Sequence, residues 1–558
     1  MRLFVILLLL PILGYCQAPP TDRYNADLFS VSETNEILFS TAVPQPVKGG
    51  GFYEGVTGLP LNVNEDSTLF VNLYMDIFEP TGDTLCKRPV IIIAFGGGFL
   101  DGSKDHYSIR LLCQDLAKRG YVTAAIDYRL GMNIFDADLS KRAVYRGLQD
   151  GRSAVRFFRA DAASANNYKI DPNKIFIGGH SSGGFIALHN VYLDNEEIGF
   201  NERPISTFEW IQDGNPIPDQ GCLDCVGDNQ GYSGHANAAF SLAGALGSTS
   251  YIESGSDPSV VMFHSTDDDT VPYTSGEPFS SILWLVFGSD LPDVYGSSEI
   301  ATQADQVGLP YDFFSYTNRG HGVHENGSAL YSDIVPGISD WFFNQELKPK
   351  PDTLIGSDIV CNTWLQQDYY LQNGNEIYHD WQIDGGSFNS MSVNSTEVDL
   401  TWLNNNPTYQ LSVTPYNKLD AKGDEITLDI TMQTNATNTF LNQSTDWANV
   451  NNWDLLHAPL ACEDIVVNST GGSINLIVSS PSEINSLSVS PNVNLTINSD
   501  LIVDQKNTAD PVFSLSNAGT ITNNGSIYIY SHLLTQKIML LENSATINNG
   551  EIRTELKP

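Results

Sequence analysis

Short apolar runs that end in glycine or in polar residues recur along the first part of the chain. Residues 90–95, 175–177 and 260–263 are continuous apolar runs, and residues 312–316 form a more polar, strand-like stretch. Runs of this length and composition are typical of buried parallel strands that lead into loops. Residues 185–188 follow the second run as a helical stretch.

The pattern changes at the Lys-Pro-Lys-Pro segment 348–351, which predicts a linker. Beyond it Asn, Ser and Thr dominate, and residues 397–402 and 410–415 alternate between apolar and polar positions as exposed strands do. With the Trp-containing segment 381–386, they resemble a PKD-like or immunoglobulin-like β-sandwich, which we expect over residues 349–438.

A loose repeat follows, in which residues 517–527 recur as residues 543–552. Each copy has a short apolar segment between Asn and Gly turns, which predicts a small β-solenoid over residues 439–558. Such a tail resembles those of secreted Bacteroidetes proteins. For both β-modules the sequence leaves two roles open, a spacer and weak contact with carbohydrate.

Ser181 carries the most informative motif, Gly-x-Ser-x-Gly within residues 178–184. A serine on a sharp strand-to-helix turn has a strained backbone, and a side chain at either flank would clash across the bend. The new helix then directs its N-terminus at negative charge that develops there. In a chain with 46 glycines the motif alone is equally consistent with a glycine-rich turn.

Three further segments favour a catalytic serine. Residues 96–98 are three glycines after the run 90–95, and their backbone N–H groups could approach a ligand closely. Three aspartates, 267–269, follow the run 260–263, and His321 lies between glycines after residues 312–316. The chain order Ser, Asp, His is the order of an α/β-hydrolase.

The motifs together resemble those of secreted α/β-hydrolases of the carboxylesterase type over residues 50–345. The matching segments are 95–103, 120–131, 149–159, 178–184 and 264–272. The resemblance implies an α/β fold over residues 17–348, with a mostly parallel sheet and helices on both faces. Phe95 stands where many relatives have His, and Ser265 replaces a common Gly.

The resemblance and the chemistry assign a triad. Ser181 is the expected nucleophile, His321 the base and Asp268 the acid that orients the imidazole. Aligning His264 and Pro272 on the family motif selects Asp268 over its neighbours Asp267 and Asp269. His324 is the alternative base.

An oxyanion hole is expected from three backbone N–H groups, those of Gly97, Gly98 and Ser182. His180, beside the nucleophile, and His264, at the end of a strand, are interpreted as structural. The sequence predicts no cofactor and no metal.

Seven cysteines are present, and secretion would permit disulfides. The resemblance implies a bridge between Cys86 and Cys113, which would join a strand to the next helix. Cys222 and Cys225 lie in a Gly- and Pro-rich loop outside any thioredoxin-like context, which favours a local clasp over a redox motif. Two further cysteines have no predicted pairing: Cys361 and Cys462.

The N-terminus has the charge, apolar length and small-residue boundary of a secretory signal peptide over residues 1–16. Acylation of Cys16, as in a lipoprotein, is the weaker alternative, because Tyr15 is bulky. No segment is long enough to span a membrane. A net charge of −38, from 28 basic and 66 acidic residues, argues against nucleic acid and anionic membrane surfaces as partners.

The sequence therefore predicts a secreted or cell-surface serine hydrolase that cleaves carboxylic esters through an acyl-enzyme. The expected substrate is an ester on a polysaccharide, acyl or feruloyl, or a polyester. Two alternatives remain: a serine peptidase with the same triad, and a non-catalytic binding or adhesion protein on a hydrolase scaffold.

Overall fold

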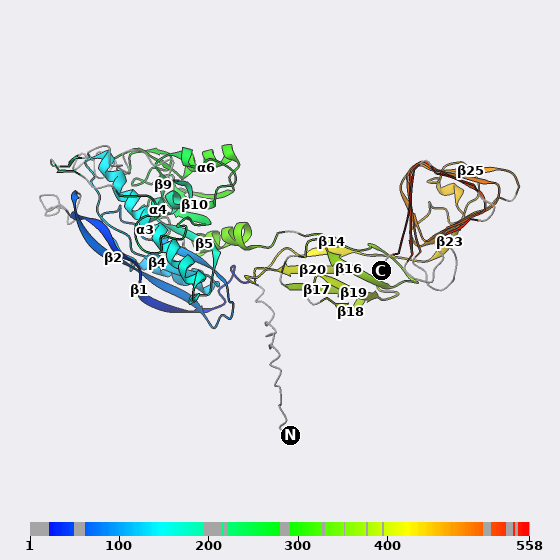
Figure 1. Cartoon of the computed structure of the whole chain (residues 1–558), viewed down its shortest axis with the longest axis horizontal. Coiled ribbons are helices and arrows are strands. Elements are labelled where there is room, and N and C mark those ends of the chain that lie inside the picture. Colours follow the sequence, from blue (N-terminus) through cyan, green and yellow to red (C-terminus); the bar gives the residue numbers. More distant parts are fainter. Residues whose placement is uncertain are drawn as a thin grey trace, which may run out of the picture. The chain divides into compact units, whose positions relative to one another are not determined.

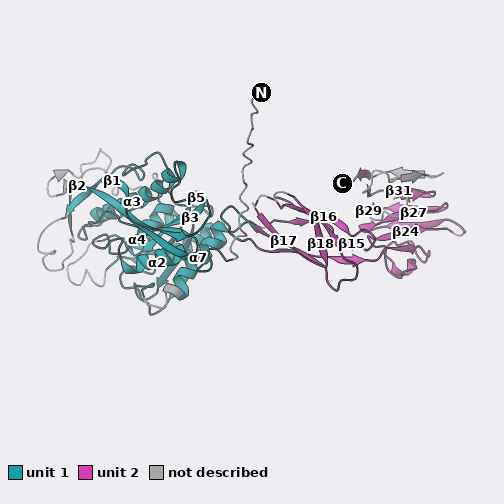
Figure 2. Cartoon of the chain, turned by 90° about the horizontal axis from the view of Figure 1, so that it is seen from below, with its two compact units in different colours: residues 1–349, 416–422 teal, residues 350–415, 423–558 magenta. Residues whose placement is uncertain are grey.

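The computed structural model describes residues 22–48, 62–194, 211–212, 215–216, 220–279, 291–325, 330–350, 352–374, 376, 378–392, 395–469, 471–505, 515–531, 539–541, 545–548 and 550–556. The chain divides into two compact units, residues 1–349 with 416–422 and residues 350–415 with 423–558 (Figure 2). The predicted signal peptide, with Cys16, lies outside the described residues. Within the described ranges, no helix is both long enough and apolar enough to cross a membrane.

A mixed sheet of eight strands forms the centre of the described part of the first unit (Figure 1). Its strands, in spatial order, are β1 (Ser30–Lys48), β2 (Val63–Thr81), β4 (Val122–Ile126), β3 (Arg88–Ala94), β5 (Ile170–His180), β8 (Ala238–Leu242), β10 (Ser259–Ser265) and β13 (Tyr311–Tyr316). Neighbours from β4 to β13 are parallel, whereas β1, β2 and β4 pair antiparallel. The carboxyl ends of the parallel strands share one edge of the sheet, where ligands bind in open α/β sheets.

The apolar runs of the sequence become the inner strands. Strands β3, β4, β8 and β10 are buried along their whole length, as strands covered on both faces require. Strand β13 lies at the edge of the sheet and is only partly buried, which explains its more polar sequence.

Helices pack on this sheet, and four of them form two pairs. Those of the first unit, within the described residues, are α2 (Tyr107–Lys118), α3 (Ala137–Ala163), α4 (Ser182–Tyr192), α6 (Ser297–Val307) and α7 (Val335–Phe342). Helix α2 packs against α7, and α3 packs against α4. The Asp136 carboxylate caps α3, accepting hydrogen bonds from the N–H groups of Asp138 and Leu139. The first unit also contains shorter elements. They are β6 (Ile211–Gln212), β7 (Asn215–Pro216), β9 (Ala245–Leu246), β11 (Ser275–Gly276), β12 (Val294–Gly296), the 3-10 turn Thr249–Tyr251 and the π-helical segments Leu330–Ile334 and Phe343–Leu347.

One short segment from far along the chain belongs to the first unit. Residues 416–422 bury Leu419 and Ala421 in its core, and the Tyr24 hydroxyl donates to the Leu419 carbonyl at 2.8 Å. This insertion lies between β20 (Gln410–Tyr416) and β21 (Ile426–Asp429), and the sequence analysis did not predict it.

The second unit contains strands only, apart from the 3-10 turn Val450–Asn452, within its described residues. Its first part has the antiparallel sheet β14-β16-β19-β18, the sheet β17-β20-β21, in which β20 and β21 are antiparallel, and a parallel pair β15-β22. The strands are β14 (Leu354–Ile355), β15 (Ile359–Cys361), β16 (Gln366–Leu371), β17 (Tyr378–Asp384), β18 (Gly386–Met391), β19 (Glu397–Trp402), β20, β21 and β22 (Thr431–Gln433).

Its second part has three parallel sheets, in the orders β23-β24-β27-β30-β33, β25-β28-β31-β34 and β26-β29-β32-β35. Consecutive strands from β24 onward go to different sheets, so the chain visits each sheet in turn. The strands are β23 (Ala436–Thr439), β24 (Glu463–Val467), β25 (Ile474–Val478), β26 (Ser482–Ile484), β27 (Ser486–Val489), β28 (Val493–Ile497), β29 (Asp500–Gln505), β30 (Leu515–Asn517), β31 (Thr520–Asn523), β32 (Ser526–Ser531), β33 (Met539–Leu541), β34 (Ala545–Asn548) and β35 (Glu551–Leu556).

The cysteines confirm one predicted bridge and correct another. Cys222 and Cys225 form a disulfide, as predicted, and Cys361 bridges Cys462 in the second unit. The predicted bridge between Cys86 and Cys113 is wrong, because both thiols are free. Cys113 is buried part-way along α2, whereas Cys86 is exposed just before the amino end of β3.

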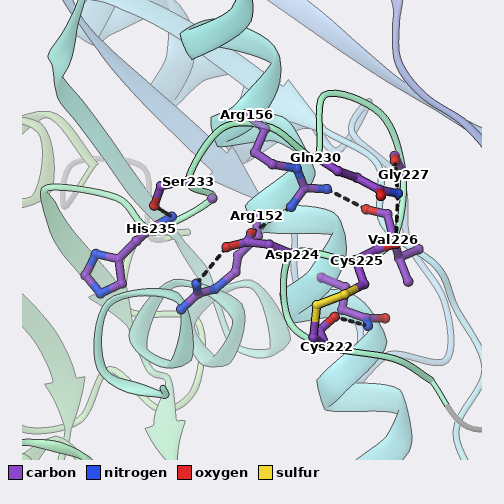
Figure 3. A network of polar contacts seen from close by, with 12 residues as sticks. Arg152, Arg156, Cys222, Asp224, Cys225, Val226, Gly227, Gln230, Ser233 and His235 are labelled. Carbon is purple, nitrogen blue, oxygen red and sulfur yellow. Dashed lines mark hydrogen bonds and ion pairs between the residues drawn. A yellow bond between two sulfur atoms is a disulfide. The ribbon is translucent and has the colours of Figure 1, made fainter. Parts of the chain in front are cut away.

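Side chains of α3 hold the loop that contains the first disulfide (Figure 3). Asp224, between the two bridged cysteines, accepts from Arg156 at 2.7 Å and from Arg152 at 3.4 Å. Arg156 is fully buried, so this pairing satisfies a charge that would otherwise be costly inside the protein. These contacts fix the loop to α3, whereas the disulfide closes only the loop itself.

Candidate active site

Ser181 lies on the turn between β5 and α4, with φ 53° and ψ −120°. The turn is possible because glycines flank it. A Cβ on Gly179 would lie 2.4 Å from the Ala94 carbonyl oxygen, and one on Gly183 would lie 2.1 Å from it. The Ser181 N–H donates to the Leu242 carbonyl at 2.8 Å, which fixes the turn against β8. The strain at Ser181 is the backbone feature that the motif predicts.

Asp268 and His321 meet at the carboxyl ends of β10 and β13. His321 Nδ1 lies 2.8 Å from Asp268 Oδ2, and His264 Nε2 lies 3.1 Å from the same oxygen. Asp268 Oδ1 accepts from the N–H groups of Thr270 at 2.8 Å and Val271 at 2.9 Å. Burial acts to raise the pKa of Asp268, but the hydrogen bonds, those from His264 and His321 above all, hold it well below its usual range. The carboxylate therefore stays ionised at neutral pH.

The other candidates around this pair have different contacts. Asp267 and Asp269 are exposed, and Asp267 accepts from Ser265 Oγ and the Gly320 N–H. His324 is buried, and its Nε2 lies 2.9 Å from Ser108 Oγ. Among the described contacts, His321 is hydrogen-bonded to Asp268 and not to Ser181 Oγ. Such bonds are often long in substrate-free sites and tighten when substrate binds.

His180 connects the serine turn to the loop of His321. Its Nε2 lies 3.1 Å from the His321 carbonyl oxygen, which pairs an N–H donor with that acceptor. Its ring centroid is 4.8 Å from that of His321 and 4.5 Å from that of His324. Burial, followed by the neighbouring His324 and His321, lowers the pKa of His180 well below its ordinary value. Burial, with His106 and His321 nearby, lowers the pKa of His324 to about 3. Both rings are neutral at neutral pH.

The glycine loop after β3 passes directly beside the serine turn. A Cβ on Gly96 would lie 3.2 Å from Ser181 Cβ, and one on Gly97 would lie 1.9 Å from the Asp101 carbonyl oxygen. Gly97 and Gly98 both have positive φ, at 140° and 61°. Within the described residues, neither of their N–H groups donates a hydrogen bond. These N–H groups are therefore available to an incoming acceptor.

Tyr128 joins this loop to the start of α4, a contact that the sequence analysis missed. Its hydroxyl lies 3.0 Å from the Phe95 carbonyl oxygen and 2.9 Å from Ser182 Oγ. The next residue, Arg129, is buried and bonded to Asp150 of α3 through its backbone N–H at 2.7 Å and its Nε at 2.9 Å. The only sequence signal for this role was the position of Tyr128 in the family motif 120–131.

A cavity of about 250 Å³ opens beside Ser181. Gly98, Ser181 and Ser182 contribute to its wall, whereas Gly97, Asp268 and His321 do not. Most of the wall is apolar, with side chains that include Phe99, Val144, Leu148, Phe185, Leu193 and Leu291. The site can thus present a serine hydroxyl to a ligand whose apolar part is enclosed.

Part of this chain is similar to known proteins. Residues 75–215 match the BD-FAE family, a range that includes Gly97, Gly98, Ser181 and Ser182. Lipase 1 and Lipase 2 of Geotrichum candidum are 28% and 27% identical to this chain over 175 and 182 residues, which are 30% and 32% of this chain. Arylacetamide deacetylase of Bos taurus is 28% identical over 146 residues, 25% of this chain and 34% of that protein.

The chain spans only 30% and 31% of the length of the two lipases. Among solved structures, a Thermogutta terrifontis esterase 2 is 24% identical, with 50% of this chain and 92% of that chain covered and a TM-score of 0.35. The sequence matches support the predicted α/β-hydrolase fold.

Proposed function

We propose that the protein is a serine ester hydrolase that acts through an acyl-enzyme on Ser181. The observation that carries this proposal is the strained Ser181 turn at the wall of an apolar cavity. Beside it, His321 is bonded to the buried side chain of Asp268. Relatives named lipase favour ester bonds over peptide bonds as the target.

In the proposed reaction, Ser181 Oγ attacks the carbonyl carbon of the ester while His321 takes the hydroxyl proton. The tetrahedral intermediate collapses, the bond to the alkoxy oxygen breaks, and His321 gives its proton to the departing alcohol. Water then attacks the acyl-enzyme in the same way and releases the acid. Asp268 keeps its charge throughout and stabilises the protonated His321.

The negative charge on the intermediate would be stabilised by the N–H groups of Gly97, Gly98 and Ser182. The unengaged N–H groups of the glycine loop and the N-terminal end of α4 support this assignment. Removal of one donor in such a site typically costs about 2.7–4 kcal/mol of transition-state stabilisation.

For the substrate, we propose an ester carried by a polysaccharide or a polyester. The apolar cavity supports an acyl group larger than acetyl, because an acetyl group would leave most of its wall without contact. We further propose that the second unit combines an immunoglobulin-like sandwich with a β-solenoid and serves as a spacer with weak carbohydrate contact. Its antiparallel sheets, followed by three parallel ones, support that architecture. Secretion through a signal peptide at residues 1–16 remains part of the proposal.

The test is hydrolysis of p-nitrophenyl acetate, butyrate and octanoate by the full chain and by Ser181→Ala. We expect the substitution to lower kcat by about four to six orders of magnitude, as loss of a triad nucleophile does. We also expect kcat/KM to rise from acetate to butyrate. Equal rates for both proteins would refute the proposal and favour the peptidase and binding-protein alternatives.

A further inference from the structure

Three side chains of metal-ligand type gather beside the proposed triad. His180 ends β5, and His324 and Glu325 follow β13 on the loop of His321. One ligand atom from each lies within 4.8 Å of the other two. His321 takes no part in this grouping, and neither does Asp268.

His324 carries an unsatisfied nitrogen. The residue is 1% exposed, and its Nδ1 has no hydrogen-bond partner. A buried polar atom left unpaired costs about 1–3 kcal/mol, so its retention calls for a ligand. Its Nε2 lies 2.9 Å from Ser108 Oγ, which lies 2.9 Å from His106 Nδ1. When Nε2 donates to Ser108, Nδ1 presents a lone pair, the arrangement that orients histidines on metal ions.

The donors fit a transition-metal ion better than calcium or magnesium. Two neutral imidazoles and a carboxylate are common ligands of Zn²⁺, whereas calcium and magnesium prefer oxygen ligands alone. Three protein ligands leave a fourth tetrahedral position for water. Glu325 is exposed, which gives an ion a route into the site.

We propose that His180, His324 and Glu325 bind Zn²⁺ or a similar divalent transition-metal ion, and that its binding slows ester hydrolysis. Two features of the site connect binding to rate. The His180 ring is next to the His321 ring and its Nε2 contacts the His321 carbonyl, so a metal that moves the His180 ring disturbs the loop of the base. A divalent cation here also opposes the positive charge that His321 gains when it accepts the Ser181 proton.

Binding is tested without any substrate. The tag-free full chain, stripped with EDTA and dialysed, is titrated with ZnCl₂ by calorimetry and with CoCl₂ by visible absorption. We expect binding of one ion at this site, and Glu325→Gln should weaken it by at least about 10-fold, the lower limit for loss of even an indirect metal partner. Glu253→Gln, which changes another exposed carboxylate of the same unit, should leave affinity unchanged.

Equal affinity of Glu325→Gln and the unchanged chain would overturn the proposed site, as would the absence of any binding. His324→Gln is the second variant, and it should abolish the cobalt absorption. Its folding is checked by circular dichroism, because the residue is buried.

The effect on rate rests on the proposed ester hydrolysis and is measured separately. Hydrolysis of p-nitrophenyl butyrate should fall as Zn²⁺ occupies the site, and Glu325→Gln should need at least about 10-fold more Zn²⁺ for the same inhibition. Full activity at saturating Zn²⁺ would overturn the inhibition. A metal-free protein with no hydrolysis would refute the proposed function and leave the binding result intact.

Discussion

Tyr128 offers the sharpest test of the proposed oxyanion hole. Its hydroxyl contacts the two segments that supply the proposed donors, the glycine loop after β3 and the start of α4. The hydroxyl bonds to the Phe95 carbonyl, just before the glycine loop, and to Ser182, whose N–H is the third proposed donor. The substitution Tyr128→Phe removes only this oxygen. The ring can keep its stacking on Phe95, at a centroid distance of 4.3 Å.

The expected magnitudes follow from the two hydrogen bonds that the substitution removes. Neutral hydrogen bonds contribute about 0.5–1.5 kcal/mol each, so the free energy of unfolding should fall by about 1–3 kcal/mol. Complete loss of an oxyanion donor costs about 10²–10³ in kcat, but here the donors remain and lose only their support. We therefore expect kcat to fall about 10-fold, which corresponds to about 1.4 kcal/mol in the transition state. KM should stay unchanged, since the interaction acts in the transition state alone.

Steady-state hydrolysis of p-nitrophenyl butyrate and urea unfolding measure the two effects. Tyr121→Phe is the matched control, because this tyrosine is also fully buried and its hydroxyl makes a 3.4 Å contact with the Ser339 carbonyl. The control should lose stability and keep its kcat. If Tyr128→Phe behaves in the same way as this control, Tyr128 supports the fold and not the oxyanion hole.

Three further predictions concern the acid, a buried histidine and the disulfides. Asp268→Asn should lower kcat by about 10⁴-fold at neutral pH, because the amide would stabilise the wrong tautomer of His321. Burial lowers the pKa of His189 to about 4 in the folded protein, so the unfolded chain takes up the proton first as pH falls. Stability should then fall by roughly 3 kcal/mol between pH ~6.5 and ~4, and His189→Gln should remove that part of the slope in urea unfolding. Reduction should destabilise the second unit more than the first in calorimetry, because Cys361–Cys462 closes a loop worth about 4.7 kcal/mol and Cys222–Cys225 one worth about 2 kcal/mol.

A specific result would contradict each of these three predictions. An Asp268→Asn variant with unimpaired kcat would remove this residue from the proposed triad. An unchanged pH slope in His189→Gln would mean that other groups cause the loss of stability. If reduction lowered the unfolding temperature of the first unit alone, the loop-length reasoning would be wrong.

The strands of the sheet could be predicted where burial restricts their positions to apolar residues. Runs such as 90–95 and 260–263 are apolar because β3 and β10 are covered on both faces, and this pattern is visible without a structure. The Ser181 turn was equally visible, because Gly179 and Gly183 lie where any Cβ would collide with the Ala94 carbonyl. Steric demands of this kind act on single positions, so the residue type at that position reveals them in the sequence.

Contacts between distant segments could not be recognised from single residue types. The bond from Tyr128 to Ser182 joins residues 54 positions apart, and neither residue type reveals it. The same holds for Leu419, whose burial in the first unit depends on a turn between two strands of the second unit. The Cys86–Cys113 bridge was inferred from resemblance, and it failed because a shared motif does not fix where flanking side chains point.

The contacts of Asp268 also bear on which residue of the proposed triad holds the proton taken from the serine. The carboxylate accepts bonds from His321, His264 and the N–H groups of Thr270 and Val271, which together favour its charged form. These contacts hold the pKa of Asp268 well below its usual range. Transfer of a proton from His321 to Asp268 would therefore run uphill. In the proposed reaction, the acid would orient the imidazole and stabilise its positive charge, and the proton taken from Ser181 would stay on His321 until the alcohol leaves.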